Sequence, residues 1–132
     1  MAVVLIVEDD EQVRVLAESI LRDVGYAVVT ATGLEGCEAL LETEQPIDLL
    51  FIDIRLGSDL EGGLRVAKNA VDHRRGLPVL YTTGGGISDG TKALFTEPSR
   101  FLPKPYTVEQ LTESVAYLLM RANPPPRPSL SV

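Results

Sequence analysis

The sequence predicts an α/β fold with a parallel sheet, because three observations agree. Short apolar runs of strand type alternate with segments whose apolar residues recur at helical spacing. Two of these runs end at acidic residues, the first at Glu8 and Asp9 and the third at Asp53. A later run, Arg100 to Leu102, leads into Lys104-Pro105. Ligands of parallel sheets bind beyond the carboxyl ends of the strands, so these are the residues placed to do chemistry.

Length, charge and cysteine content narrow the class of protein. A chain of 132 residues has room for one domain that buries about two thirds of its unfolded surface. The net charge of -7 and the lack of a Lys/Arg run argue against direct binding to nucleic acid or to an anionic membrane. A single cysteine, Cys37, cannot form an internal disulfide, and charged residues cut the first apolar run too short for a signal peptide. We therefore expect a cytoplasmic protein.

The first two strand–helix units are clear in the pattern. Val3 to Val7 fits a strand buried on both faces, and Ala27 to Ala31 indicates a second strand. Between them a helix is expected, with Gly25 as its stop. Its apolar residues are Val13, Leu16, Ile20, Leu21 and Val24. A second helix, ending before Pro46, has the apolar stripe Leu34, Cys37, Leu40 and Leu41.

The third and fourth strands flank a long loop and a helix. Leu49 to Ile52 predicts the third strand, and Val79 to Thr82, opened by Pro78, predicts the fourth. A glycine-containing loop from Arg55 to Gly63 precedes the intervening helix, Leu64 to Ala70. The expected core face of this helix is Leu64, Ala67 and Val71.

The last part of the chain has one weak and one strong helix. Between Gly84 and Ser99, three consecutive glycines precede a short apolar run that Pro98 cuts off, so a fourth helix there is expected to be short and marginal. The fifth strand lies around Arg100 to Leu102. Thr107 then caps a final helix. Its apolar residues are Leu111, Val115, Leu118 and Leu119.

These elements place one domain at residues 1–121, followed by a proline-rich tail at 122–132. The tail has no periodicity, which is typical of a disordered extension. Its PPPRP segment has the composition of an SH3-type ligand, but a frayed terminus is the commoner explanation.

The residues at the strand ends suggest phosphate chemistry. Glu8, Asp9 and Asp53 supply hard oxygen ligands, which suit Mg²⁺ better than zinc. Lys104 adds a positive charge that can pair with a carboxylate or with a phosphoryl oxygen, and Thr83 offers a hydroxyl at the same edge. This set of groups supports phosphoryl transfer to a carboxylate, with Asp53 as the nucleophile.

Four motifs in order resemble the receiver domain of two-component response regulators. They are VLIVEDD, DLLFIDIRL, PVLYTTG and FLPKPY, and the resemblance covers roughly residues 2–120. It implies a flavodoxin-like, doubly wound, five-stranded parallel sheet with strand order 2-1-3-4-5.

The resemblance also implies roles for the charged residues. Glu8 and Asp9 match the acidic pair that holds Mg²⁺, and Asp53 matches the phosphoacceptor, itself a metal ligand. The backbone carbonyl of Arg55 would be a further ligand, and Lys104 matches the family lysine. For Asp10 and Glu11, charges that suit a helix N-terminus are the better interpretation.

A second group of matched residues concerns switching. Thr83 matches the hydroxyl that moves toward the phosphoryl group, and Phe101 lies where the family places a rotating aromatic residue, although Phe101 fits plain core equally well. Pro105 matches the proline that follows the lysine in a cis peptide bond. Thr82 competes with Thr83 for the switch role, but the register from Pro78 favours Thr83, and Thr82 would then point into the structure.

Other reactive residue types have plainer interpretations. Cys37 and Met120 are expected to be packing residues. His73 is expected at a helix end, as a surface or dipole residue and not as a phosphate carrier.

The chain departs from the family pattern around the acceptor. Gly57 stands where a proline is usual, and the loop that contains it is longer than usual. Gly84 and Gly85 leave the acceptor site open, whereas the long cation of Arg55 is able to reach over Asp53. We therefore expect Arg55 to slow hydrolysis of an acyl phosphate.

The predicted function is that of a single-domain response regulator. It would take a phosphoryl group from a sensor histidine kinase or a phosphotransfer protein and would signal by docking onto a downstream protein target. A phosphate-independent interaction module is the alternative, although the acidic residues, Thr83 and Lys104 are all retained. An aspartyl hydrolase is less favoured, because Arg55 stands where that class needs a second acid.

Overall fold

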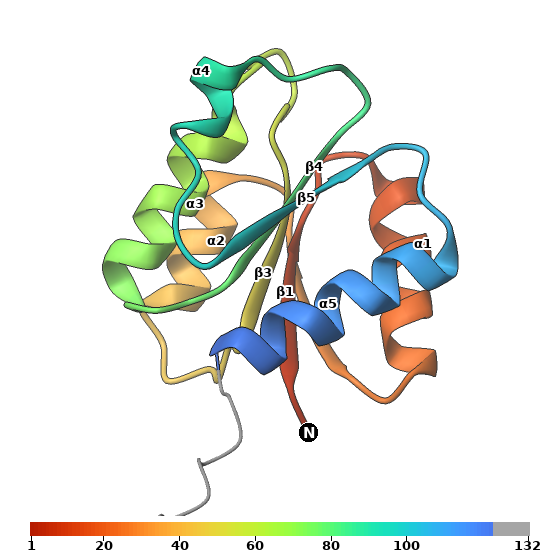
Figure 1. Ribbon diagram of the computed structural model, residues 1–132. Coiled ribbons are helices and arrows are strands. Elements are labelled where there is room, and N and C mark those ends of the chain that lie inside the picture. The colour runs from red at the N-terminus through yellow and green to blue at the C-terminus, as the bar shows by residue number, and fades with distance from the viewer. Residues whose placement is uncertain (123–132) are drawn as a thin grey trace, which may run out of the picture.

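Five strands and five helices alternate along the chain in the computed structural model, which describes residues 1–122 (Figure 1). The strands are β1 (Val3–Val7), β2 (Ala27–Ala31), β3 (Leu49–Asp53), β4 (Val79–Thr83) and β5 (Ser99–Pro103). The helices are α1 (Glu11–Asp23), α2 (Leu34–Leu41), α3 (Gly62–His73), α4 (Asp89–Lys92) and α5 (Val108–Ala122). The proline-rich tail and its PPPRP segment lie outside the described residues.

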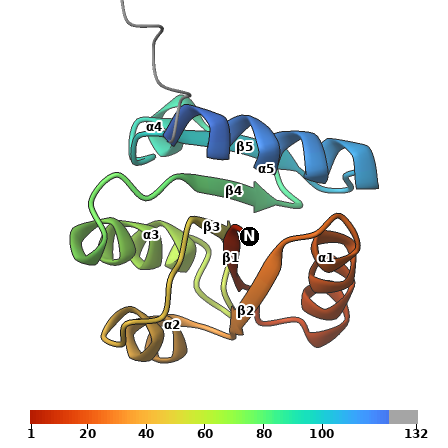
Figure 2. The same cartoon turned by 90° about the horizontal axis from the view of Figure 1, so that it is seen from below.

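The strands form one parallel sheet in the order β2-β1-β3-β4-β5, as predicted, and this order can be followed from below in Figure 2. Val7 pairs with Ile52, and Asp53 pairs with Thr82. The register therefore brings the residues that follow β1 next to the end of β3 and the end of β4. All the candidate charges meet at this edge of the sheet.

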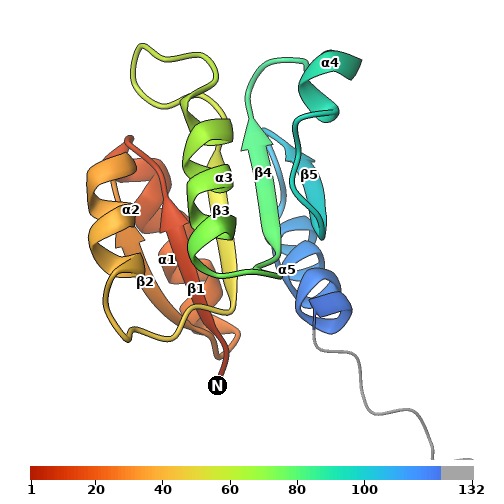
Figure 3. The same cartoon turned by 90° about the vertical axis from the view of Figure 1, so that its left-hand side faces the viewer.

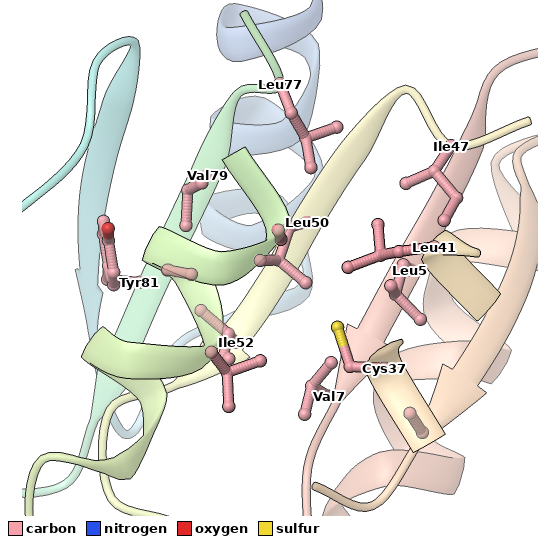
Figure 4. Close-up of a cluster of buried hydrophobic side chains, with 14 of the residues drawn as sticks. Leu5, Val7, Cys37, Leu41, Ile47, Leu50, Ile52, Leu77, Val79 and Tyr81 are labelled. Carbon is pink, nitrogen blue, oxygen red and sulfur yellow. The ribbon is translucent and has the colours of Figure 1, made fainter. Parts of the chain in front are cut away.

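Helices cover both faces of the sheet, with α2 and α3 on one side and α1 and α5 on the other (Figures 1 and 2). The β-branched and leucine-rich strands β1, β3 and β4 supply side chains to both layers, as expected for strands buried on two faces. Figure 4 shows the core on the α2–α3 side, where Cys37 of α2 packs beside Val7 of β1. Cys37 is fully buried, so its assignment as a packing residue is confirmed.

Some residues that the sequence placed in the core are exposed in the structure, so those predictions are wrong. In α1 the buried residues are Ala17 and Leu21, whereas Leu16 is 62% exposed and Val24 is also exposed. Met120 of α5, expected to pack, is 64% exposed. Spacing alone placed these residues on a wide apolar stripe, but a helix that packs on a sheet buries only a narrow line of contact. In α1, Ala17 and Leu21 occupy that line.

The helix ends agree better with the sequence. Thr107 Oγ1 accepts a hydrogen bond from the backbone N–H of Gln110 at 3.0 Å, and the Gln110 side chain accepts from the N–H of Thr107 at 2.9 Å. This is a reciprocal cap of α5. His73 lies exposed at the end of α3, as expected. The marginal fourth helix is also confirmed, because α4 has four residues, with Ser88 as its cap.

Within residues 1–122, no helix is both long enough and apolar enough to cross a membrane.

Candidate functional site

The site lies where β1 and β3 end side by side. Glu8 directly follows β1, and Asp53 is the last residue of β3. Both residues are buried: Glu8 exposes 5% of its surface and Asp53 exposes 7%. Two buried negative charges next to each other are costly unless a positive charge compensates them.

Lys104 supplies that compensation. It directly follows β5, and its backbone N–H donates to the carbonyl of Thr83 at 3.0 Å, which fixes the start of its side chain. Its Nζ lies 2.6 Å from Asp53 Oδ2 and 3.0 Å from Glu8 Oε1. One half-buried lysine therefore bridges two carboxylates from different strands, and the structure brings together three residues that the sequence predicted as partners.

Backbone groups hold the remaining carboxylate oxygens. The N–H of Arg55 donates to Asp53 Oδ1 at 3.0 Å, and the N–H of Asp10 donates to Glu8 Oε2 at 3.1 Å. Asp53 is thus held at both oxygens, one by the backbone and one by Lys104. A carboxylate fixed in this way is oriented before any reaction begins.

The environment shifts the pKa values of several groups here. Burial raises the pKa of Glu8, although the Asp10 N–H and Lys104 oppose the shift. Burial alone would lower the pKa of Lys104, but its hydrogen bonds to Asp53 and Glu8 outweigh burial and raise it. Burial likewise raises the pKa of Tyr106. Lys104 therefore stays charged at neutral pH.

Asp9 is an exposed residue that points to a different partner. Its Oδ2 accepts a hydrogen bond from the backbone N–H of Gly57 at 2.8 Å. Burial would raise the pKa of Asp9, but interactions with Glu8 and with the Gly57 N–H outweigh it and lower the value. Asp9 therefore ties the segment after β1 to the loop after β3.

That loop, residues 54–61, is folded back on itself. The backbones of Leu56 and Asp59 exchange two hydrogen bonds of 3.0 Å, and Arg65 of α3 forms an ion pair with Asp59. Gly57 has φ +59°, a left-handed conformation that favours glycine. The residues that depart from the family pattern, 57–63, thus include a turn with paired backbone groups, close in the chain to Asp53.

Gly63 is a residue whose importance sequence reasoning missed. Its N–H donates to the Ile54 carbonyl at 2.7 Å, and α3 begins so close to β3 that a Cβ at Gly63 would lie 2.6 Å from Ile54 Cα and would overlap the backbone of Asp53. The signal was present as two consecutive glycines, Gly62 and Gly63, at the start of a helix, where glycine is otherwise unfavourable. This glycine lets the start of α3 lie directly against the backbone of Asp53 and Ile54.

The chemistry of the predicted metal ligands fits Mg²⁺, because carboxylates with a backbone carbonyl and waters are its usual set. The conformation does not gather them, since no three acidic, His or Cys side chains of residues 1–122 surround a common point. Lys104 lies between Glu8 and Asp53, and Asp9 turns toward Gly57. Binding Mg²⁺ would therefore require Asp9 or Lys104 to change partners.

The switch candidates lie along β4 and β5. Thr83 is buried at the end of β4, and Phe101 of β5 is partly buried, with its ring 6.3 Å from that of Phe95. The Lys104–Pro105 peptide bond is cis. The side chain of Arg55 is exposed and forms no ion pair with any residue of the described chain.

Thr82 points into the structure, as the register predicted. It is 2% exposed and pairs with Asp53 across the β3–β4 ladder. A small cavity of about 10 Å³ lies at this point, and Thr82, Glu8 and Asp53 all line it.

Two known proteins of similar sequence are named as regulators. The chain is 32% identical over 114 residues to the alginate biosynthesis transcriptional regulatory protein AlgB of Pseudomonas aeruginosa, which covers 86% of this chain and 25% of AlgB. It is 31% identical over 124 residues to the response regulator MprA of Mycobacterium avium, covering 92% of this chain and 52% of MprA. The chain thus spans between a quarter and about half of the length of these relatives.

Known structures show the same fold. A CheY-like receiver domain protein of Methanospirillum hungatei superposes with a TM-score of 0.82 at 24% identity, over 92% of this chain and 96% of that one. A receiver protein of Sinorhizobium medicae gives a TM-score of 0.82 at 25% identity, over 92% and 97% of the two chains.

The family model for the response regulator receiver domain matches residues 4–116, which include all the charged residues of the site. Receiver domains are signalling domains of two-component systems. They generally use Mg²⁺ at their phosphorylation site and interact with histidine kinases and effectors. With the sheet order and the strand-end charges in agreement, the chain belongs to the response regulator receiver domain family.

Proposed function

We propose that this receiver accepts a phosphoryl group on Asp53 in a Mg²⁺-dependent reaction and passes the signal on by changing the surface that it offers to a protein target. One observation carries the proposal. Asp53 is a buried carboxylate at the carboxyl end of β3, held by Lys104 at 2.6 Å and by the Arg55 N–H at 3.0 Å. This is an acceptor oriented beside a fixed positive charge.

The donor would be a phosphohistidine of a sensor kinase or of a phosphotransfer protein. A carboxylate oxygen of Asp53 attacks phosphorus, the new O–P bond forms as the P–N bond breaks, and the imidazole nitrogen keeps the electron pair of that bond. Lys104 stabilises the negative charge on the phosphoryl oxygens and on Asp53 as the transfer proceeds. Glu8 tethers the other side of Lys104, which keeps Nζ at the site.

The residues that would hold Mg²⁺ are Glu8, Asp9 and Asp53, with the backbone carbonyl of Arg55. Bound there, the ion would neutralise charge on the phosphoryl oxygens. On this proposal the hydrogen bond between Asp9 and the Gly57 N–H couples metal binding to the ordered turn at residues 54–61.

Signal output would start from Thr83 and Phe101. The Thr83 hydroxyl would donate to a phosphoryl oxygen, and its movement would free space for Phe101, whose ring lies against Phe95. The short helix α4 and its flanking segments would then become ordered, which is a known type of switch.

The proposal is tested by incubating the protein with Mg²⁺ and a small phosphodonor and measuring intact mass, with Asp53→Asn in parallel. We expect one phosphoryl adduct that requires Mg²⁺ and is absent from the variant. A folded wild-type protein that neither gains an adduct nor binds Mg²⁺ would contradict the proposal and would favour a phosphate-independent interaction module.

Arg55 is expected to lengthen the life of the acyl phosphate, because its exposed cation stands two residues after Asp53, the last residue of β3. Phosphoryl loss from Arg55→Ala should be several-fold faster than from wild type. Arg75→Ala, which removes the same charge from an exposed position at the other end of the strands, just before β4, is the matched control. Equal decay in Arg55→Ala and wild type would exclude this role.

A further inference from the structure

The hydroxyl of Thr82 is the one buried side-chain polar atom that lacks a hydrogen-bond partner within residues 1–122. Thr82 is 2% exposed and belongs to a central strand. A buried hydroxyl without a partner is unfavourable, and native proteins nearly always satisfy such groups, often with an ordered water. The position of Thr82 therefore points to a partner that is not a protein group.

The cavity beside Thr82 has the size for such a partner, and two carboxylates line it together with the Thr82 side chain. Its volume of about 10 Å³ is close to the smallest that holds one water molecule. Most of the residues that line it are apolar, and they include Phe51 of β3 and Ala17 of α1. Its polar lining includes Glu8 and Asp53, whose carboxylates are both more than nine-tenths buried.

We propose that Thr82 holds a single water molecule in this cavity and, through that water, positions the Asp53 carboxylate. A buried water needs two to four polar partners, and Thr82, Asp53 and Glu8 offer three. The hydroxyl of Thr82 can either donate to the water or accept from it, whereas the ionised carboxylates can only accept. The water thus donates to the same carboxylates that accept hydrogen bonds from Lys104 and from backbone N–H groups.

Thr82 is on this account a positioning residue, because its side chain reaches the Asp53 carboxylate only through the water, although the two backbones are neighbours in the β3–β4 ladder. Without the water, Asp53 keeps Lys104 and the Arg55 N–H but loses a third point of fixation. The consequence for phosphorylation rests on the proposed function of Asp53. The water site itself does not depend on that function.

Two variants separate the hydroxyl from the shape of the side chain. Thr82→Val keeps the shape and removes the hydroxyl, and Thr82→Ser keeps the hydroxyl. A high-resolution crystal structure should show water density in the cavity of the wild type and of Thr82→Ser, and none in Thr82→Val. Thermal unfolding is measured without Mg²⁺ or donor, so that it reports on the site and not on the reaction.

The sign of the stability change in Thr82→Val decides whether a water occupies the cavity. If the water is bound, Thr82→Val lowers the melting temperature, since the buried carboxylates lose a hydrogen-bond donor. If the cavity is dry, Thr82→Val raises the melting temperature or leaves it unchanged, because an unsatisfied hydroxyl has been removed. A dry wild-type cavity or a melting temperature that does not fall overturns the proposal.

The rate of phosphorylation decides whether the water positions the Asp53 carboxylate. We expect Thr82→Val to gain the phosphoryl adduct several-fold more slowly than wild type at saturating Mg²⁺, and Thr82→Ser to recover most of the rate. A bound water with an unchanged rate in Thr82→Val would overturn the positioning role. If the wild type gains no adduct at all, the proposed function fails, and the density and the melting temperatures still decide the water site.

Discussion

Two glycine-containing loops leave the same edge of the sheet, and they differ in what holds them (Figure 3). The loop between β3 and α3, residues 54–61, is tied by a hydrogen bond to Asp9, by its own paired backbone and by an ion pair with Arg65. The loop between β4 and α4 contains Gly84, Gly85 and Gly86, and a Cβ at any of them would meet no atom within 4 Å.

The glycines of the two loops serve different purposes. Gly57 and Gly63 are required by local structure, one by its positive φ and the other by its contact with the backbone of β3. None of residues 84–86 has a positive φ, and none is crowded. We infer that the first loop builds the acceptor, whereas the second leaves the site accessible and the α4 segment free to reorder.

The largest effect is expected at Gly63. Gly63→Ala should lower the free energy of unfolding by about 3 kcal/mol, because the new methyl group overlaps main-chain atoms that cannot move aside. Denaturant unfolding of this variant beside Gly85→Ala measures the contrast. Equal stability of the two variants would show that the two loops do not differ in the way described.

Substitutions at Gly57 and Gly84 should change the stability of the fold by smaller amounts and in different directions. Gly57→Ala should destabilise the fold by about 1 kcal/mol, since alanine pays a penalty at φ +59°. Gly84→Ala should be neutral or stabilise it by about 0.5 kcal/mol, because the unfolded chain loses freedom while nothing is strained. A stabilising Gly57→Ala, seen in the same unfolding assay, would refute the requirement for glycine at that position.

The two loops should also respond to different ligands. Adding Mg²⁺ should shift the amide resonance of Gly57, because its N–H is bound to a predicted metal ligand, Asp9. Phosphorylation or a phosphoryl mimic should instead slow amide exchange between Gly84 and Ser99. Unchanged exchange in that segment on phosphorylation would count against α4 as the responsive element.

The reactivity of the buried Cys37 thiol tests whether the effects of the glycine substitutions stay local. Burial raises its pKa to about 11, so the native thiol is protonated and unreactive at pH 8. Because the folded pKa lies above the thiol's ordinary pKa of 9.0, the contribution of Cys37 to stability is full below pH 9 and is lost as pH rises through 11. Thiol labelling at pH 8 should speed up in Gly63→Ala and stay at the wild-type rate in Gly85→Ala.

The strands and the convergence of charges could be predicted from the sequence because both depend on short-range patterns. β-branched runs define the strands, and the parallel arrangement brings Glu8, Asp53 and Lys104 to one edge without further information. The exposed Leu16 and Met120 were missed because helical spacing does not say how narrow a contact line is. The Gly63 contact and the Thr82 cavity depend on distances between segments far apart in sequence, which no local pattern contains.

The central claim is that Asp53, and no other carboxylate at this edge, receives the phosphoryl group. Borohydride reduces an aspartyl phosphate to homoserine, which leaves a stable mark at the modified residue. After treatment with Mg²⁺ and phosphodonor, peptide mapping should find homoserine at position 53. Reduction at Glu8 or Asp9, or at no residue of a folded and Mg²⁺-saturated protein, would contradict the account.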